Sequence, residues 1–180
     1  YVFKSNSSGI YSDGSYCNYF IDNTLYLNDK EGMCLDAGSF GNYVSGNTIK
    51  QNGGRRRQTL ADLENDFVQD FGTLSDGSSP AKLPGLSIDN SAYNIVMNNY
   101  ICDNYGSGVK MVRVGVRNIV SDNIIANNNR GQSENFHFFG IELGYAAKPD
   151  YETVMLDFAA CYENIICRNI ITGEHYAGIF

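Results

Sequence analysis

The segment NIVMNNYICDNYGSGVKM, residues 94–111, has asparagine at three positions that are five residues apart. The same spacing recurs along the chain, so that five segments have asparagine at their second and seventh positions. They read CNYFIDNTLYLN (17–28), GNYVSGNTIKQN (41–52), YNIVMNNYICDN (93–104), RNIVSDNIIANN (117–128) and ENIICRNIITGE (163–174). Four of the five have asparagine again at the twelfth position, where the last has Glu174. Such self-similarity indicates a repeat architecture.

A second element lies between these segments and consists of a glycine followed by alternating apolar residues. Its copies are GIYSD (9–13), GMCLD (32–36), GLSID (85–89), GVKMV (108–112), GIELG (140–144) and GIF (178–180). Successive glycines are 23 residues apart in two cases and 53, 32 and 38 apart in the others. The longer intervals therefore contain insertions of 30, 9 and 15 residues.

A repeat of 23 residues is too short for two helices and a turn, and it fits a coil of three short strands. In the glycine-led strands the second and fourth residues are nearly all apolar, which is the alternation of a half-buried strand. Asparagine then falls at the bends, where its side chain tolerates left-handed backbone and bonds nearby backbone groups. Stacked coils would place equivalent asparagines about 4.8 Å apart, so their amides are expected to form ladders.

This pattern resembles the right-handed parallel β-helix repeat proteins, which include pectate lyases, polygalacturonases, alginate and chondroitin lyases, phage tailspikes and NosD-like periplasmic proteins. The resemblance covers nearly the whole chain, from GIYSD to GIF. It implies an all-β fold, a right-handed parallel β-helix solenoid of about five to six coils of ~23 residues. The leucine-rich repeat alternative fails because the L-x-x-L-x-L frame is absent.

The resemblance also assigns the parts of each coil. The glycine-led strand is expected in the first sheet, and the asparagine of the seventh position in the turn between the second and third sheets. Residues 1–180 form one domain, with loop insertions at about 53–84, 129–139 and 145–160. The first two insertions precede glycine-led strands, so two long loops are expected beside the first sheet. Because the chain shows no amphipathic capping helix, we expect it to be an excerpt of a longer β-helix.

Composition restricts the ligands and the compartment. A net charge of −7 and a pI near 4.7 argue against nucleic acid and fit neutral ligands, or anionic ligands bound through a cation. Five cysteines without a CxxC pair indicate neither a disulfide framework nor a zinc site. Apolar runs never reach the ~18 residues of a membrane span. Within these limits the resemblance implies a polysaccharide or oligosaccharide partner. It also implies an extracellular or periplasmic location, including the cell surface or a virion.

The register predicts two outward-facing columns on the first sheet. One column reads Tyr11, Cys34, Ser87, Lys110, Glu142, and the other reads Asp13, Asp36, Asp89, Val112, Gly144. Carboxylates on successive coils repel one another, and Ca²⁺ would relieve the repulsion, which predicts a calcium site formed by Asp13, Asp36 and Asp89. Alternatively, each aspartate only starts the next turn by bonding its own backbone.

The insertions beside the first sheet supply further candidates, because long loops on a rigid scaffold commonly carry function. The first loop contains Arg55, Arg56 and Arg57, and the second contains Arg130 and His137 among phenylalanines. The arginines are predicted to bind substrate, as is the outward-facing tyrosine at position 11. Alternatively, the arginines only form a solvated charged loop. His137 is either a packed, hydrogen-bonded histidine or a residue with a catalytic or sugar-stacking role.

Two mechanisms fit this face. In the first, which some lyases of this fold resemble, calcium held by Asp36 and Asp89 binds an acidic polysaccharide. Lys110 takes the proton α to the uronate carboxylate, and an arginine of residues 55–57 stabilises the developing charge. Against it, a lysine beside carboxylates is expected to have a raised pKa, which opposes a role as base.

In the second mechanism Asp89 and Glu142 hydrolyse a glycosidic bond. They lie two coils apart, roughly 10 Å, within side-chain reach of an inverting pair. The polygalacturonase motifs NTD, DD, GHG and RIK and the pectate lyase motifs W-x-D-H and R-x-P-x-x-R are missing, so neither family is assigned. The sequence thus favours a polysaccharide lyase or glycoside hydrolase acting along the first sheet. The alternative is a non-catalytic glycan-binding or structural β-helix, as in a tailspike, an adhesin or a NosD-like protein, as a homotrimer or part of a longer chain.

Overall fold

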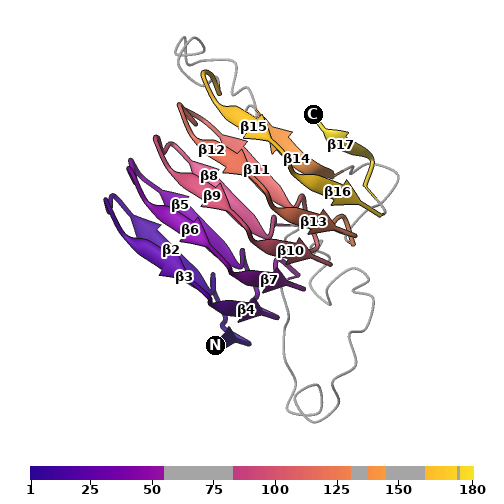
Figure 1. Cartoon of the computed structure of the whole chain (residues 1–180). Helices are drawn as coiled ribbons and strands as arrows, with labels where there is room; N and C mark the ends of the chain where they lie inside the picture. Colours follow the sequence, from indigo (N-terminus) through magenta and orange to yellow (C-terminus); the bar gives the residue numbers. More distant parts are fainter. Residues whose placement is uncertain (55–82, 131–137, 145–160, 174) are drawn as a thin grey trace, which may run out of the picture.

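The computed structural model describes residues 1–54, 83–130, 138–144, 161–173 and 175–180. The chain winds through three parallel sheets that stack coil upon coil (Figure 1). The described residues contain strands, turns and bends but no helix. This arrangement is the right-handed parallel β-helix that the repeat predicted.

Each coil contributes one strand to each of the three sheets. The first sheet contains β2 (Ile10–Asp13), β5 (Met33–Asp36), β8 (Leu86–Asp89), β11 (Val109–Val112), β14 (Phe139–Leu143) and β17 (Ala177–Ile179). The second contains β3 (Tyr19–Ile21), β6 (Tyr43–Ser45), β9 (Ile95–Met97), β12 (Ile119–Ser121) and β15 (Ile165–Cys167). The third contains β1 (Val2–Phe3), β4 (Thr24–Tyr26), β7 (Thr48–Lys50), β10 (Tyr100–Cys102), β13 (Ile124–Ala126) and β16 (Ile170–Thr172).

The core lies inside the stack and is formed by apolar side chains that point inward from the strands. It consists of Leu25, Met33, Leu35, Val44, Ile49, Leu86, Ile88, Val96, Ile101, Val109, Met111, Val120, Ile125 and Ile141, all fully buried. The glycines that precede β2, β5, β8 and β11 are needed because the corner is crowded. A Cβ at Gly108 would lie 2.5 Å from Cγ2 of Ile125 and 2.7 Å from the carbonyl oxygen of Gly140.

Three asparagine ladders run along the bends. They are Asn18, Asn42, Asn94, Asn118 and Asn164; Asn23, Asn47, Asn99, Asn123 and Asn169; and Asn28, Asn52, Asn104 and Asn128. In each step the backbone N–H and the side-chain amide of one asparagine donate to the side-chain oxygen of the next. Asn42 donates to Oδ1 of Asn94 at 2.9 and 3.0 Å. The predicted ladders are confirmed, and the seventh-position asparagines lie between the second and third sheets as expected.

The left-handed backbone lies one residue earlier than expected. It is the residue before the ladder asparagine that has a positive φ, as at Cys17, Leu27, Tyr93 and Arg117. The asparagine itself is free to bond both its neighbouring coils, because the preceding residue makes the bend. In the last coil His175 accepts the Asn128 backbone N–H at Nε2, 3.2 Å away, one residue later than the repeat frame predicted.

Candidate functional site

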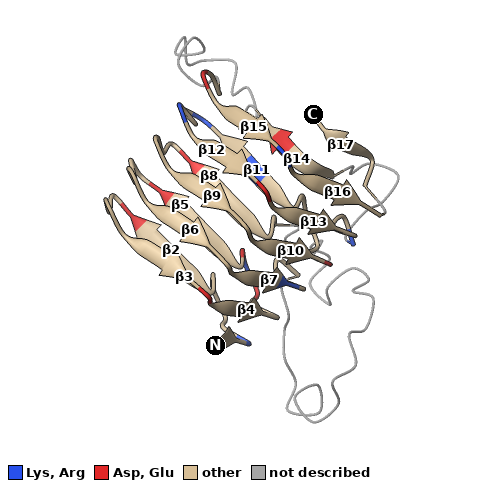
Figure 2. Cartoon of the chain, in the orientation of Figure 1, with Lys and Arg blue, Asp and Glu red and all other residues tan. Residues whose placement is uncertain are grey.

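The first sheet presents the outward columns that the register predicted. Tyr11 pairs with Cys34, Cys34 with Ser87, Ser87 with Lys110, and Lys110 with Glu142. In the second column Asp13 pairs with Asp36, and Asp89 with Val112. Figure 2 shows acidic residues recurring at the ends of β2, β5 and β8. Side chains from distant parts of the sequence therefore share one face.

Two adjoining pockets hollow this face, with volumes of about 510 and 180 Å³. Both are lined by Glu31, Leu83, Ser87 and Asp89, so they form one elongated depression, here called the first-sheet groove. The remaining lining residues are Ser7, Ser8, Tyr11, Lys30, Cys34 and Asp36 in the larger pocket, and Pro84, Ser107, Lys110, Val112, Phe138 and Glu142 in the smaller. The groove runs across the strands and crosses several coils.

One edge of the first-sheet groove is apolar. Leu83, Pro84 and Phe138 line the smaller pocket, and they belong to the C-terminal ends of the two sequence insertions that were expected beside this sheet. The parts of these insertions between their ends, with Arg55, Arg56, Arg57 and His137, lie outside the described residues. The described ends nevertheless give the groove one apolar edge beside a polar floor.

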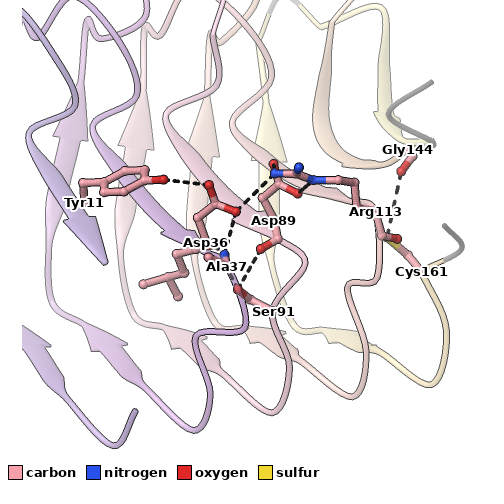
Figure 3. Close-up of polar contacts among 9 residues, drawn as sticks. Tyr11, Asp36, Ala37, Asp89, Ser91, Arg113, Gly144 and Cys161 are labelled. Carbon is pink, nitrogen blue, oxygen red and sulfur yellow. Dashed lines mark hydrogen bonds and ion pairs between the residues drawn. The ribbon is translucent and has the colours of Figure 1, made fainter. Parts of the chain in front are cut away.

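A hydrogen-bonded row of side chains crosses the ends of β2, β5, β8 and β11 (Figure 3). The Tyr11 hydroxyl donates to Oδ2 of Asp36 at 2.8 Å, and Nη2 of Arg113 donates to Oδ1 of Asp36 at 3.1 Å. Arg113 also holds both carboxylate oxygens of Asp89 through Nε and Nη2. This bidentate contact explains why the pKa of Arg113 is raised. Hydrogen bonding to Asp36 raises the pKa of Tyr11 to about 12.

A second polar cluster lies at the other end of the first-sheet groove. The Lys110 ammonium is 2.6 Å from Oε1 of Glu142, and Ser107 donates to Oε2 of the same carboxylate at 2.6 Å. The Phe139 backbone N–H donates in turn to the Ser107 hydroxyl at 3.1 Å. Both oxygens of Glu142 are thus occupied, and Lys110 is an ion-pair partner in this structure.

The described residues give the expected calcium site no support, and calcium binding stays a prediction. Asp36 and Asp89 share the Arg113 guanidinium, so a cation from the chain already neutralises part of their charge. Asp13 pairs with Asp36 along the sheet, yet among the described residues no group of three or more His, Cys, Asp and Glu side chains is placed to hold a metal ion. The carboxylate repulsion that motivated the calcium prediction is relieved by Arg113 instead.

The remaining predicted residue, Arg130, is not a lining residue of the first-sheet groove. Its guanidinium lies 3.8 Å from the Asp103 carboxylate, beside the third asparagine ladder. Several contributors were missed by the sequence reasoning, among them Lys30, Glu31, Ser107 and Arg113. Arg113 could have been found from its place one residue beyond a first-sheet strand, next to the aspartate column. Ser107, which directly precedes the strand glycine, carries no comparable signal.

Three stacked parallel sheets with a polar groove along one of them define a β-helix protein with one elongated, hollowed face. A family model described as "Periplasmic copper-binding protein (NosD)" matches residues 1–137. The chain therefore belongs to the NosD family. No curated protein matches the chain. None of the described segments forms a helix long and apolar enough to cross a membrane.

Two solved structures share the fold. The enzymatically active domain of tailspike protein 2 from bacteriophage CBA120 has a TM-score of 0.59 at 12% identity, covering 95% of this chain and 19% of that chain. The A-module of mannuronan C-5 epimerase AlgE6 from Azotobacter vinelandii has a TM-score of 0.61 at 18% identity, covering 96% and 44%. At these identities the similarity concerns the fold alone. The chain spans less than half the length of either structure.

The described side chains do not match the copper in the family description. Copper sites use cysteine, methionine and histidine ligands, and a cysteine must be deprotonated to bind. Met33 and Met111 are fully buried in the core, and burial raises the pKa of the Cys34 thiol in the groove to about 12. Among the described residues, moreover, no three His, Cys, Asp and Glu side chains are placed together to hold a metal ion, so no copper site built from cysteine and histidine is seen there.

Proposed function

We propose that the chain binds a polysaccharide or oligosaccharide along the first-sheet groove. The observation that carries the proposal is the groove itself, which joins two pockets across several coils and suits an extended ligand better than a compact one. Its floor offers hydroxyl, carboxylate and ammonium groups, two of the carboxylates are bound by the Arg113 guanidinium, and its edge is apolar. A sugar presents hydroxyl groups around an apolar ring face, so both surfaces have a complement.

The location named for the family and the net charge of the chain also support this proposal. A glycan-binding role fits the periplasmic location that the family description names, and the fold is shared with a mannuronan C-5 epimerase. The acidic net charge of −7 supports a partner other than nucleic acid.

The test is binding to immobilised glycans, measured for the full chain and for two matched variants. Ser87→Phe places a ring on the groove floor, whereas Ser45→Phe places the same ring on β6 in the second sheet. We expect Ser87→Phe to abolish binding and Ser45→Phe to retain it. Equal binding by both variants, with unchanged thermal stability, would place the ligand elsewhere and refute the proposal.

Catalysis in the same groove is the second candidate, as a polysaccharide lyase or a glycoside hydrolase. It is favoured by one observation, that Asp89, Lys110 and Glu142 all line the smaller pocket. Against it, Lys110 is bound to Glu142 and Asp89 is bound to Arg113, so each group must first leave its partner before it can act on a substrate.

A glycan panel separates binding from turnover. Absorbance from unsaturated uronates reports a lyase, and new reducing ends report a hydrolase. A catalytic groove would give one of these signals, and Glu142→Gln would remove it without removing glycan binding. Absence of both signals on every bound glycan leaves the binding proposal intact and eliminates catalysis.

A further inference from the structure

We infer that the first-sheet groove selects an uncharged glycan and excludes polyuronates; the inference rests on the glycan-binding function proposed above. Four carboxylates line the groove, those of Glu31, Asp36, Asp89 and Glu142. Lys30 and Lys110 line it as well, and the Arg113 guanidinium binds two of the four carboxylates. Among the described residues the carboxylates therefore exceed these cationic groups by one, and a chain with a carboxylate on every sugar meets net repulsion there.

The state of each cation matters more than the count. The carboxylate-binding edge of Arg113, formed by Nε and Nη2, is already filled by Asp89, and Nη2 also donates to Asp36. Of the three side-chain nitrogens of Arg113, only Nη1 has no hydrogen-bond partner among the described residues. Asp89 thus occupies the bidentate contact through which an arginine binds a carboxylate strongly. What remains is a pair of N–H donors suited to a hydroxyl oxygen.

Lys110 is likewise already bound to a carboxylate of the protein. Its ammonium lies 2.6 Å from Glu142, whose side chain is only 12% exposed. Transfer of Lys110 to a uronate would leave this half-enclosed carboxylate without its cation, which costs more than the new contact returns. Lys30 is the cation that forms no ion pair among the described residues, and it lies at the surface, where solvent and salt screen its charge.

Hydroxyl groups meet none of these obstacles. Each hydroxyl both donates and accepts, and the groove supplies acceptors in the remaining lone pairs of its carboxylates and donors in Arg113 and Ser87. The apolar edge of Leu83, Pro84 and Phe138 can cover a sugar ring face. Paired charges thus act here as fixed hydrogen-bonding groups for a neutral ligand.

The experiment compares one polymer in two charge states. A polyuronate and its carboxyl-reduced derivative have the same linkages and differ only in the carboxylates. We expect the wild-type protein to bind the reduced polymer about tenfold or more tightly than the polyuronate, a difference expected from like-charge repulsion and an unmet desolvation cost. The preference should persist with and without added calcium.

Variants test the cause. Asp36→Asn with Asp89→Asn removes two carboxylates and frees the Arg113 fork, so polyuronate affinity should rise about tenfold or more. Asp122→Asn is the control, because Asp122 is likewise held by an arginine, Arg168, away from the groove. If the double variant does not fold, Asp36→Asn alone is measured.

The outcomes are distinct. Wild-type binding of the polyuronate as tight as that of its reduced derivative would overturn the inference while leaving the glycan-binding function in place. Failure of both polymers and of all neutral glycans to bind would refute the function itself. Tighter binding of the reduced polymer that Ser87→Phe abolishes supports both.

Discussion

Arg113 donates a hydrogen bond of 3.1 Å to Asp36, a residue 77 positions earlier in the chain, and reaches it past Asp89 on the intervening coil. Two aspartates from different coils are thus held by one guanidinium. The arrangement replaces a bound cation by a side chain of the protein itself, and it sets the charge of the groove.

Replacement of Arg113 by methionine should make the protein responsive to calcium. Without the guanidinium, Asp36 and Asp89 repel one another, and Ca²⁺ can neutralise them. Because the Arg113 side chain is 49% exposed and the pair is screened by solvent, the loss of stability should be about 1 kcal/mol or less. The melting temperature of Arg113→Met should rise in millimolar calcium. Arg168→Met, which breaks a surface pair with Asp122, should show no such rise. A calcium-dependent rise in the wild-type protein would contradict the assignment.

Truncation of a central ladder residue should be far more costly than truncation at the end of the ladder. Asn99 is 2% exposed; its Oδ1 accepts from Asn47, and its Nδ2 donates to Asn123. Asn99→Ala leaves buried polar groups unsatisfied, which should cost about 3 kcal/mol or more in urea unfolding. Asn23→Ala, at the partly exposed start of the same ladder, is the matched control and should cost clearly less. Equal losses would show that the ladder is not the source of the stability.

The strand glycines should differ sharply in their tolerance of a methyl group. At Gly108 the added Cβ would clash with Ile125 and with the backbone of Gly140, so Gly108→Ala should destabilise by about 1–3 kcal/mol. At Gly178, in the same column, the nearest atom to such a Cβ is 3.9 Å away. Gly178→Ala should therefore leave the melting temperature nearly unchanged. A large loss at both positions would point to backbone conformation rather than crowding.

Acid should weaken the last coil through His175. Its Nε2 accepts the Asn128 N–H and must be unprotonated to do so, and burial lowers its pKa below the ordinary value of 6.5. A group with a depressed pKa in the folded state contributes stability above its unfolded pKa, and loses it as the pH falls through the folded pKa. The wild-type protein should therefore lose more stability between pH 8 and pH 5 than His175→Asn, whose amide is not titrated. Parallel stability profiles for the two proteins would contradict this role.

Much of the architecture was predictable because it repeats. Asn94, Asn99 and Asn104 recur in equivalent positions on neighbouring coils, since every coil needs the same bonds at the same bends. The left-handed residues before them were not predictable. Cys17 and Leu27 occupy such positions, and their residue types carry no signal for a positive φ. At these bends the stacked coils impose the conformation.

The site was less accessible to sequence reasoning because its key contact is not periodic. The position of Arg113 is held by Gly14, Ala37 and Asn90 in other coils, which share a left-handed backbone and no side-chain chemistry. Counting carboxylates in one column predicted calcium, since the arginine one residue further on was left out of the count. Likewise, the frame assigned the last ladder position to Glu174, and His175 holds it because the chain takes one more residue there.

The bond from Asn52 to Asn104 has consequences for how such a chain can change. Residues 55–82 intervene between these coils, yet the two donor distances, 2.9 and 3.1 Å, match those of the uninterrupted step from Asn28 to Asn52 at 3.0 and 2.9 Å. The spacing between coils is thus set within the twelve-residue asparagine frame. The length of the segment between that frame and the next strand glycine does not change this spacing. An insertion at this point of the coil is therefore compatible with an unbroken asparagine ladder, and we expect changes in its length to leave the scaffold intact.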